Sequence, residues 1–83
     1  MIPDEVVAEM VTGAWRSELG LDEITEASFF ELGGNSAIVA RLAYQIESGL
    51  NIKFPLEVLF LDGRLAPLIA ECQRAVRAGL PAE

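Results

Sequence analysis

The spacing of apolar residues is the feature that most restricts how this chain can fold. In the first segment they recur every three or four positions and so share one face of a helix: Val7, Met10, Val11, Ala14 and Trp15. Pro3 suits a first helical turn, and Gly20 supplies a stop. The sequence therefore predicts a helix from about Pro3 to Leu19, whose apolar face must pack against other elements.

A second helix with the same periodicity is predicted in the middle of the chain. We expect it to begin at Asn35 or Ser36 and to end near Glu47 or Ser48, with Gly49 as its terminator. Its core side carries four apolar residues, with a fifth at the edge: Val39, Leu42, Ala43, Ile46 and, at the edge, Ile38.

Two further helices complete the prediction. A short one runs from about Leu56 to Leu61, and a longer one runs from Leu65 to about Ala78, ended by Gly79 and then Pro81. The core stripe of the last helix is Leu65, Leu68, Ile69, Cys72, Ala75 and Val76. Because the β-like runs are too short and isolated to make a sheet, the predicted class is all-α. A chain of 83 residues leaves room for one domain, residues 1–83.

The segment between the first two helices, residues 20–34, has no sustained helical period. A loop of this length is uncommon in so small a domain unless it is pinned or functional. Four apolar side chains could anchor it to the core: Ile24, Phe29, Phe30 and Leu32.

The charge of the chain excludes nucleic acid as a partner. Thirteen acids against six bases give a net charge of −7, whereas phosphate binding depends on Lys and Arg. Five acids and no base lie between Ser17 and Arg41, a field that would steer basic protein surfaces. A solvated acidic loop is the plainer explanation of the same charges.

Several other classes are excluded by what the composition lacks. No apolar run approaches the length of a membrane span, and the acidic start, Asp4, Glu5 and Glu9, is unlike a secretory signal, so we expect a cytoplasmic protein. Cys72 is the single cysteine and there is no histidine, so neither a disulfide nor a metal site is expected.

The chemistry is expected where the long loop meets the second helix, at Gly33, Gly34, Asn35 and Ser36. Two glycines permit positive φ and remove bulk in front of the serine, so a side chain at Gly34 should crowd its approach. Asn35 is a favoured N-cap. Without a histidine to activate it, and without the closing glycine of a hydrolase elbow, Ser36 is predicted to be a substrate rather than a catalyst.

The segment around Ser36 resembles the peptidyl carrier, or thiolation, domains of nonribosomal peptide synthesis. Those domains share a Phe-Phe-x-Leu-Gly-Gly-x-Ser core, matched here by Phe29, Phe30, Leu32, Gly33, Gly34 and Ser36. Trp15 late in the first helix and Leu59-Phe60 before the last helix also agree. The chain departs from the pattern at Asn35, where His or Asp is usual, at Ala37, where Leu is usual, and in lacking the Pro-Thr that commonly opens the last helix.

The resemblance implies a right-handed four-helix bundle with a short third helix. It also implies that Ser36 accepts 4'-phosphopantetheine from coenzyme A through a phosphopantetheinyl transferase, and that the arm then carries an aminoacyl or peptidyl thioester. The chain itself would be a monomeric, non-catalytic carrier. Its partners would be an adenylation enzyme and condensation, thioesterase or tailoring enzymes.

The exposed side of the second helix is a candidate partner interface, formed by Ala37, Ile38, Ala40, Arg41 and Tyr44. Small alanines and a tyrosine can equally be ordinary surface residues. Two other functions stay open: an acyl carrier of fatty-acid or polyketide type, which typically has Asp-Ser-Leu at the acceptor, and a helical adaptor in which Ser36 is no more than part of a helix start. The initiator methionine and the end after the last helix lead us to expect a free-standing protein, although an excised module would look the same.

Overall fold

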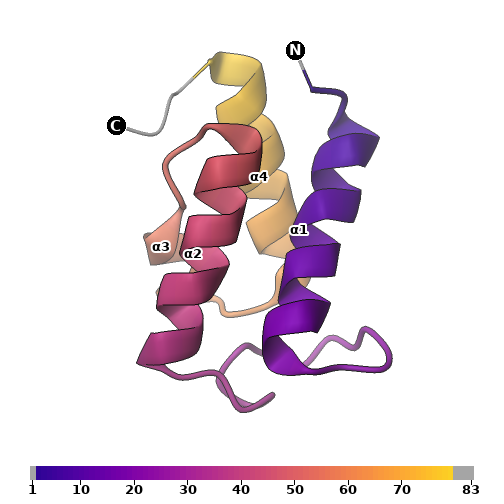
Figure 1. Cartoon of the computed structure of the whole chain (residues 1–83), viewed down its shortest axis with the longest axis vertical. Helices are drawn as coiled ribbons and strands as arrows, with labels where there is room; N and C mark the ends of the chain where they lie inside the picture. Colours follow the sequence, from indigo (N-terminus) through magenta and orange to yellow (C-terminus); the bar gives the residue numbers. More distant parts are fainter. Residues whose placement is uncertain (1, 80–83) are drawn as a thin grey trace.

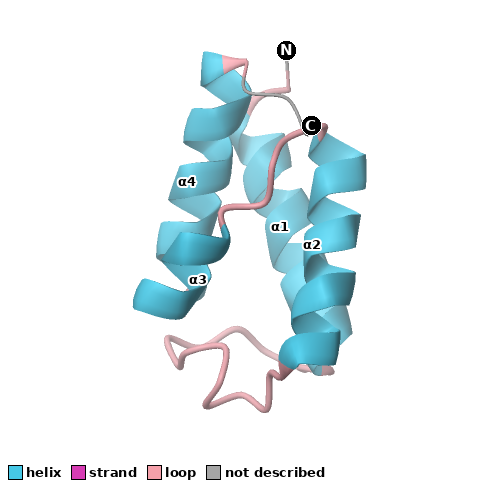
Figure 2. Cartoon of the chain, turned by 90° about the vertical axis from the view of Figure 1, so that its left-hand side faces the viewer, coloured by secondary structure: helices cyan, strands magenta, loops and turns pink. Residues whose placement is uncertain are grey.

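The computed structural model describes residues 2–79, which form four helices around one core (Figure 1). They are α1 (Asp4–Leu19), α2 (Ser36–Leu50), α3 (Leu56–Leu61) and α4 (Leu65–Ala78). The long helices α1, α2 and α4 lie side by side along the longest axis, and short α3 lies beside the lower half of α4 (Figures 1 and 2). No strand occurs within residues 2–79, so the all-α prediction is confirmed.

The helix ends follow the local turn chemistry at most places. Gly20 and Gly79 close α1 and α4 in the left-handed conformation, with φ of 66° and 69°. Pro67 is the third residue of α4, where its missing N–H has no partner to lose. The second predicted stop of α4, Pro81, lies outside the described residues.

The predicted end of α2 was wrong. The helix continues through Gly49 to Leu50, and Asn51, with φ of 54°, is the left-handed cap. Leu50 is buried, so the two or three extra residues add an apolar contact to the core. A Cβ on Gly49 would overlap the end of the Met10 side chain. Gly49 therefore allows α1 to pack closely instead of stopping the helix.

The core lies between α1, α2 and α4 and includes side chains of the loops. On α2, Leu42 and Ile46 are fully buried and Ile38 packs at the edge of the core, as the sequence predicted; Val39 and Ala43, predicted for the core side, are only partly buried. Trp15 and Phe29 are the largest buried side chains, and their rings meet edge to face at 5.7 Å. Among the described residues, no helix combines the length and the apolar character needed to cross a membrane.

Cys72 is buried in this core, and burial raises the pKa of its thiol to about 12. At pH 8 roughly one molecule in ten thousand would carry a thiolate there, against about a quarter for an ordinary cysteine. We therefore expect no alkylation of the native protein by iodoacetamide at pH 8 over an hour, and rapid alkylation in 8 M urea. Mass spectrometry checks this, and rapid labelling of the native protein would contradict the burial.

The α1–α2 loop is pinned by fewer side chains than predicted. Phe29 is buried and its backbone N–H donates to the carbonyl of Gly63 at 2.6 Å, while Leu32 is half-buried against the core. Ile24 was wrong as an anchor, because 40% of its surface is exposed. Phe30 is not buried in the core, with 46% of its surface exposed, but its ring meets Phe29 edge to face at 5.2 Å. Phe30 also stacks on Phe60 of α3, with ring centroids 5.7 Å apart. These contacts hold the C-terminal half of the loop, next to α2.

Candidate functional site

Ser36 is exposed and is the first residue of α2. The preceding Asn35 has an extended backbone, and its Oδ1 accepts a hydrogen bond from the N–H of Ile38 at 3.0 Å. The carbonyl of Asn35 accepts from the N–H of Val39 at 2.9 Å. Asn35 thus caps the helix, and the exposed Ser36 side chain lies in its first turn.

The start of α2 suits a phosphate on Ser36. Within residues 2–79, the N–H groups of Ser36 and Ala37 have no hydrogen-bond partner. They belong to the first helical turn, where such groups and the helix dipole favour an anion. The exposed hydroxyl and these two donors together fit the phosphodiester of an attached phosphopantetheine.

The two glycines before Ser36 have different roles. Gly33 has φ of 95°, a backbone conformation that other residues rarely adopt, and a Cβ on it would meet nothing within 4 Å. Gly34 does not have positive φ, and a Cβ on it would overlap the ring of Phe29. The expectation that both glycines clear the approach to Ser36 is therefore wrong for Gly34, which makes room for the buried ring.

A hydrogen-bonded turn precedes the glycines. Ser28 and Glu31 bond reciprocally: the N–H of Ser28 donates to Glu31 Oε1 at 2.9 Å, and the N–H of Glu31 donates to Ser28 Oγ at 3.3 Å. This is the pattern of a capping box. The N–H of Gly34 then donates to the carbonyl of Phe29 at 2.9 Å. The segment before Ser36 is consequently a turn ordered by hydrogen bonds and not a flexible linker.

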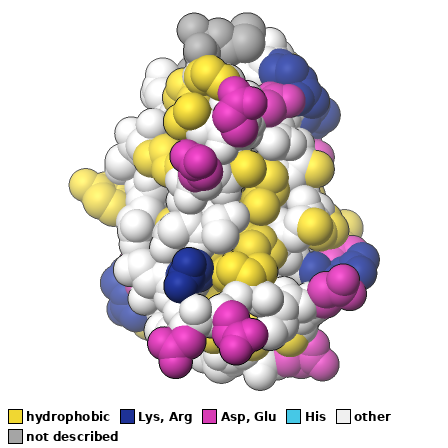
Figure 3. Space-filling view, turned by 90° about the vertical axis from the view of Figure 1, so that its right-hand side faces the viewer, with side chains coloured by type: hydrophobic (Ala, Val, Ile, Leu, Met, Phe, Trp, Pro, Cys, Tyr) yellow, Lys and Arg dark blue, Asp and Glu magenta, His cyan; other side chains and the backbone are white. Residues whose placement is uncertain are grey.

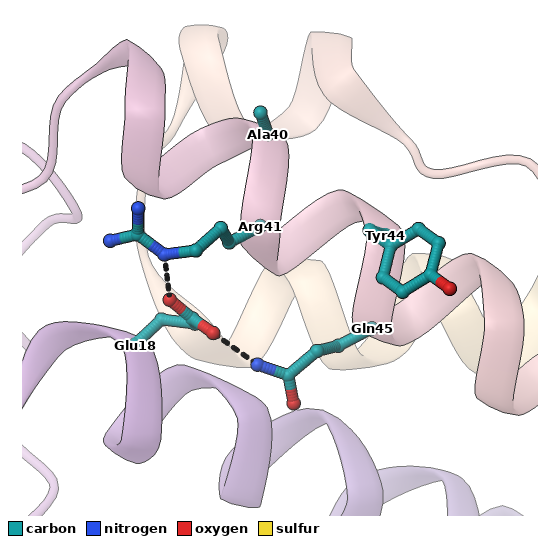
Figure 4. Close-up of a pocket in the computed structure, with 5 residues that line it drawn as sticks. All are labelled: Glu18, Ala40, Arg41, Tyr44 and Gln45. Atoms are coloured by element: carbon teal, nitrogen blue, oxygen red, sulfur yellow. Dashed lines mark hydrogen bonds and ion pairs between the residues drawn. The ribbon is translucent and has the colours of Figure 1, made fainter.

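A contact between α1 and α2 positions Arg41 (Figure 4). Glu18, near the end of α1, accepts a hydrogen bond from Arg41 Nε at 2.8 Å and another from Gln45 Nε2. Its carboxylate is the most buried of the four in ion pairs within residues 2–79, with 13% of the side chain exposed. Glu18 therefore holds two residues of α2 that are one turn apart.

A hollow of about 280 Å³ lies at this contact, lined by Glu18, Ala40, Arg41, Tyr44 and Gln45. Three of these belong to the predicted interface, and the structure brings them together on one side of α2. Ala37 is exposed nearer the helix start, whereas Ile38 is half-buried against the core. Glu18 and Gln45 were not predicted from the sequence, since no local signal reveals which acid of α1 faces which residue of α2.

The acidic field around the loop keeps most of its charge. Of its five acids, Glu18 is paired with Arg41. The other four, Asp22, Glu23, Glu26 and Glu31, are exposed, and Glu31 accepts a backbone N–H within the turn. Figure 3 shows acidic side chains at the lower end of the face over α1, where this loop lies. Within residues 2–79, no cluster of His, Cys, Asp and Glu side chains could hold a metal ion.

Replacing Glu18 by alanine tests the contact between α1 and α2. We expect a loss of about 1 kcal/mol in the free energy of unfolding, because two hydrogen bonds to a partly buried carboxylate disappear. Urea denaturation measures it. Glu9→Ala is the matched control, since Glu9 is exposed on α1 and makes no ion pair within residues 2–79. Equal stability of the two variants would show that the contact contributes nothing.

Comparison with known proteins gives one family and several relatives. The family model described as "Phosphopantetheine attachment site" matches residues 9–71, more than half of the chain. The chain is 34% identical to indigoidine synthase of Dickeya dadantii (strain 3937), over 90% of this chain and 5% of that protein. It is 32% identical to phosphinothricin tripeptide synthetase PhsC of Streptomyces viridochromogenes, over 75% of this chain and 6% of that protein.

A third relative is a linear gramicidin synthase of Brevibacillus parabrevis, 27% identical over 94% of this chain and 2% of that protein. The chain thus spans only a small fraction of the length of the curated relatives that it matches. No solved structure gave a significant match.

Proposed function

The chain belongs to the phosphopantetheine attachment family, and from this premise we propose that it is an aminoacyl or peptidyl carrier domain whose arm is attached to Ser36. The observation that carries the proposal is the exposed hydroxyl of Ser36 at the start of α2. The cofactor of the family is 4'-phosphopantetheine, bound covalently. It supplies a mobile thiol that holds the cargo as a thioester, chemistry that the chain lacks.

The residues around Ser36 present its hydroxyl to a modifying enzyme. In our proposal a phosphopantetheinyl transferase joins Ser36 Oγ to the phosphate of coenzyme A, with adenosine 3',5'-bisphosphate as the leaving group and the hydroxyl proton taken by the transferase. Asn35 caps the start of α2. Gly33 allows the positive φ of the preceding turn, and Gly34 leaves room for the Phe29 ring. The domain has no catalytic role in this scheme.

The partners in our proposal are those of nonribosomal peptide or related natural-product synthesis. An adenylation enzyme would load the cargo, and condensation, thioesterase or tailoring enzymes would use it. The names of the relatives support this choice, since one of them is described as a tripeptide synthetase. The docking surface would be the side of α2 that carries Ala37, Ile38, Ala40, Arg41 and Tyr44, and the domain would act in the cytoplasm, as a monomer.

Incubation with coenzyme A and a promiscuous phosphopantetheinyl transferase tests the proposal. We expect the mass of the protein to rise by one phosphopantetheine group, and peptide mapping to place that group on Ser36. A helical adaptor would not change in mass. Modification at Ser17, Ser28 or Ser48 instead would contradict the site while leaving the family assignment intact.

A further inference from the structure

A groove of about 730 Å³ lies where α1, α4 and the α1–α2 loop meet, and we call it the α1–α4 groove. Its volume falls within the roughly 300–1,000 Å³ that is common for binding sites, against about 280 Å³ for the hollow beside Tyr44. The proposed carrier function uses no residue of this groove. The large apolar part of its lining is Ile24 of the loop and Leu65, Pro67 and Ile69 of α4.

The groove is open because the side chains along this part of α4 are short. Towards the end of α4, Gln73 and Arg77 both reach the start of α1, where they bond the carbonyl and the carboxylate of Asp4 at 3.0 and 2.6 Å. Ala66 and Ala70 precede them on the same stripe of α4 and are exposed. An alanine is too short to reach across to α1, so long side chains bridge the two helices at one end only.

The α1–α2 loop bounds the open end of the groove. Ile24 and Thr25 line it there, and Thr12, half-buried on α1, lines it from the opposite wall. Ile24 was expected to anchor the loop in the core, but it lies at the rim of the groove with 40% of its surface exposed. Figure 3 shows hydrophobic side chains gathered down the middle of the face over α1, with acidic side chains near both ends.

Two acidic side chains flank the apolar lining. Glu26 lines the groove at the loop, and Glu9, one turn before Thr12 on α1, is exposed beside it. Neither makes an ion pair within residues 2–79. Arg64 also lines the groove, but its Nε and a terminal nitrogen donate to Asp62 at 2.7 and 3.0 Å. The charge of Arg64 is therefore offset by its own neighbour.

The wider face over the groove is negative. Arg16 of α1 is exposed, and its terminal nitrogen donates to the backbone carbonyl of Asp22 at 2.9 Å. Against this one arginine stand four exposed acids, which leaves three negative charges uncompensated; the acids are Glu9, Asp22, Glu23 and Glu26. Such a field favours a partner that carries Lys or Arg.

The walls of the groove decide the form of the partner. Both long walls are helices, which offer no strand edge to an extended peptide. A helical partner satisfies its own backbone and presents apolar side chains along one face. A second copy of this chain is disfavoured, because it would bring a net charge of −7 to an acidic face.

We propose that the α1–α4 groove is a docking site for a basic amphipathic helix of a partner protein. Its apolar side chains would lie over Ile24 and Ile69, and its Lys or Arg side chains would lie near Glu9 and Glu26. The lining of the groove comes from α1, the loop and α4, so a helix bound there leaves Ser36 and the proposed docking surface of α2 free. One protein can thus hold the domain while other enzymes act on Ser36.

NMR titration of the unloaded, ¹⁵N-labelled protein tests this site. The probes are two synthetic helical peptides with Leu at positions i, i+3, i+4 and i+7, one with Lys and the other with Glu at the flanking positions. We expect the Lys peptide to bind at least about tenfold more tightly than the Glu peptide, because the face is acidic. The signals that the Lys peptide should shift are those of Thr12, Ile24, Thr25, Ile69 and Ala70.

A matched pair of variants locates the binding. Ala70→Arg puts a long cation into the groove and should weaken binding of the Lys peptide at least about tenfold. Ala40→Arg makes the same change at an exposed alanine of α2 and should leave the affinity within about twofold. Both alanines are exposed, so both variants should fold, which urea denaturation checks. Ala70→Arg should also gain phosphopantetheine as fully as the unaltered protein.

Several outcomes would overturn the site. These are no shift at about 1 mM Lys peptide, equal affinity for the two peptides, equal affinity of the two variants, or shifts confined to residues 36–44. Shifts of the groove residues that grow with protein concentration in the absence of peptide would assign the groove to a second copy instead. The titration uses unloaded protein, so a failure of loading would contradict the attachment at Ser36 without affecting this test.

Discussion

Replacement of Ser36 by alanine abolishes loading with phosphopantetheine and leaves the fold unchanged; this is the largest effect we expect. Loading requires a hydroxyl that alanine lacks. The fold does not, because Ser36 is exposed and Asn35 supplies the cap of α2. The free energy of unfolding should change by less than about 0.5 kcal/mol. Intact mass after incubation with transferase and coenzyme A measures loading, and urea denaturation measures stability.

Asn35→Ala should have the opposite effects on stability and loading, and it serves as the control. It removes the Oδ1 acceptor for the N–H of Ile38 and should cost about 1 kcal/mol of stability, yet it keeps the hydroxyl and should still load. Ser48→Ala, at the other end of α2, should change neither quantity. Loading of Ser36→Ala to the same extent as the unaltered protein would exclude Ser36 as the acceptor.

The second large effect concerns Gly34. A methyl group at this position would overlap the ring of Phe29, which is fully buried and in contact with Trp15. We expect Gly34→Ala to cost about 3 kcal/mol in the free energy of unfolding, near the upper end for overpacking of a core. Urea denaturation measures this cost. Such a loss is a large part of the stability of a small domain.

A double-mutant cycle separates this overlap from a change in backbone strain. In a Phe29→Leu background the cost of Gly34→Ala should fall by at least about 1 kcal/mol, because the ring that the methyl group meets is gone. Gly33→Ala is the matched control: it costs about 1–2 kcal/mol through its positive φ, and that cost should not depend on residue 29. Equal costs of Gly34→Ala in both backgrounds would contradict the proposed role of Gly34.

The helices and the position of Ser36 could be predicted because they depend on residues that are near one another in the chain. Apolar spacing sets the faces of a helix, and the Asn35 side chain bonds an N–H only three residues away. The end of α2 could not be predicted in the same way. Gly49 has the local signature of a stop, but burial of Leu50 and close packing on Met10 outweigh it.

The sequence alone therefore determined the all-α class, the helix that begins at Ser36 and the core side of that helix. Only the tertiary structure decided which glycine makes room for Phe29, that Ile24 and Phe30 stay exposed, and that Glu18 holds Arg41 beside a hollow. The physical reason is that these features join residues far apart in the chain. Their contacts depend on how the helices are placed against one another, and apolar spacing within one segment carries no information about that placement.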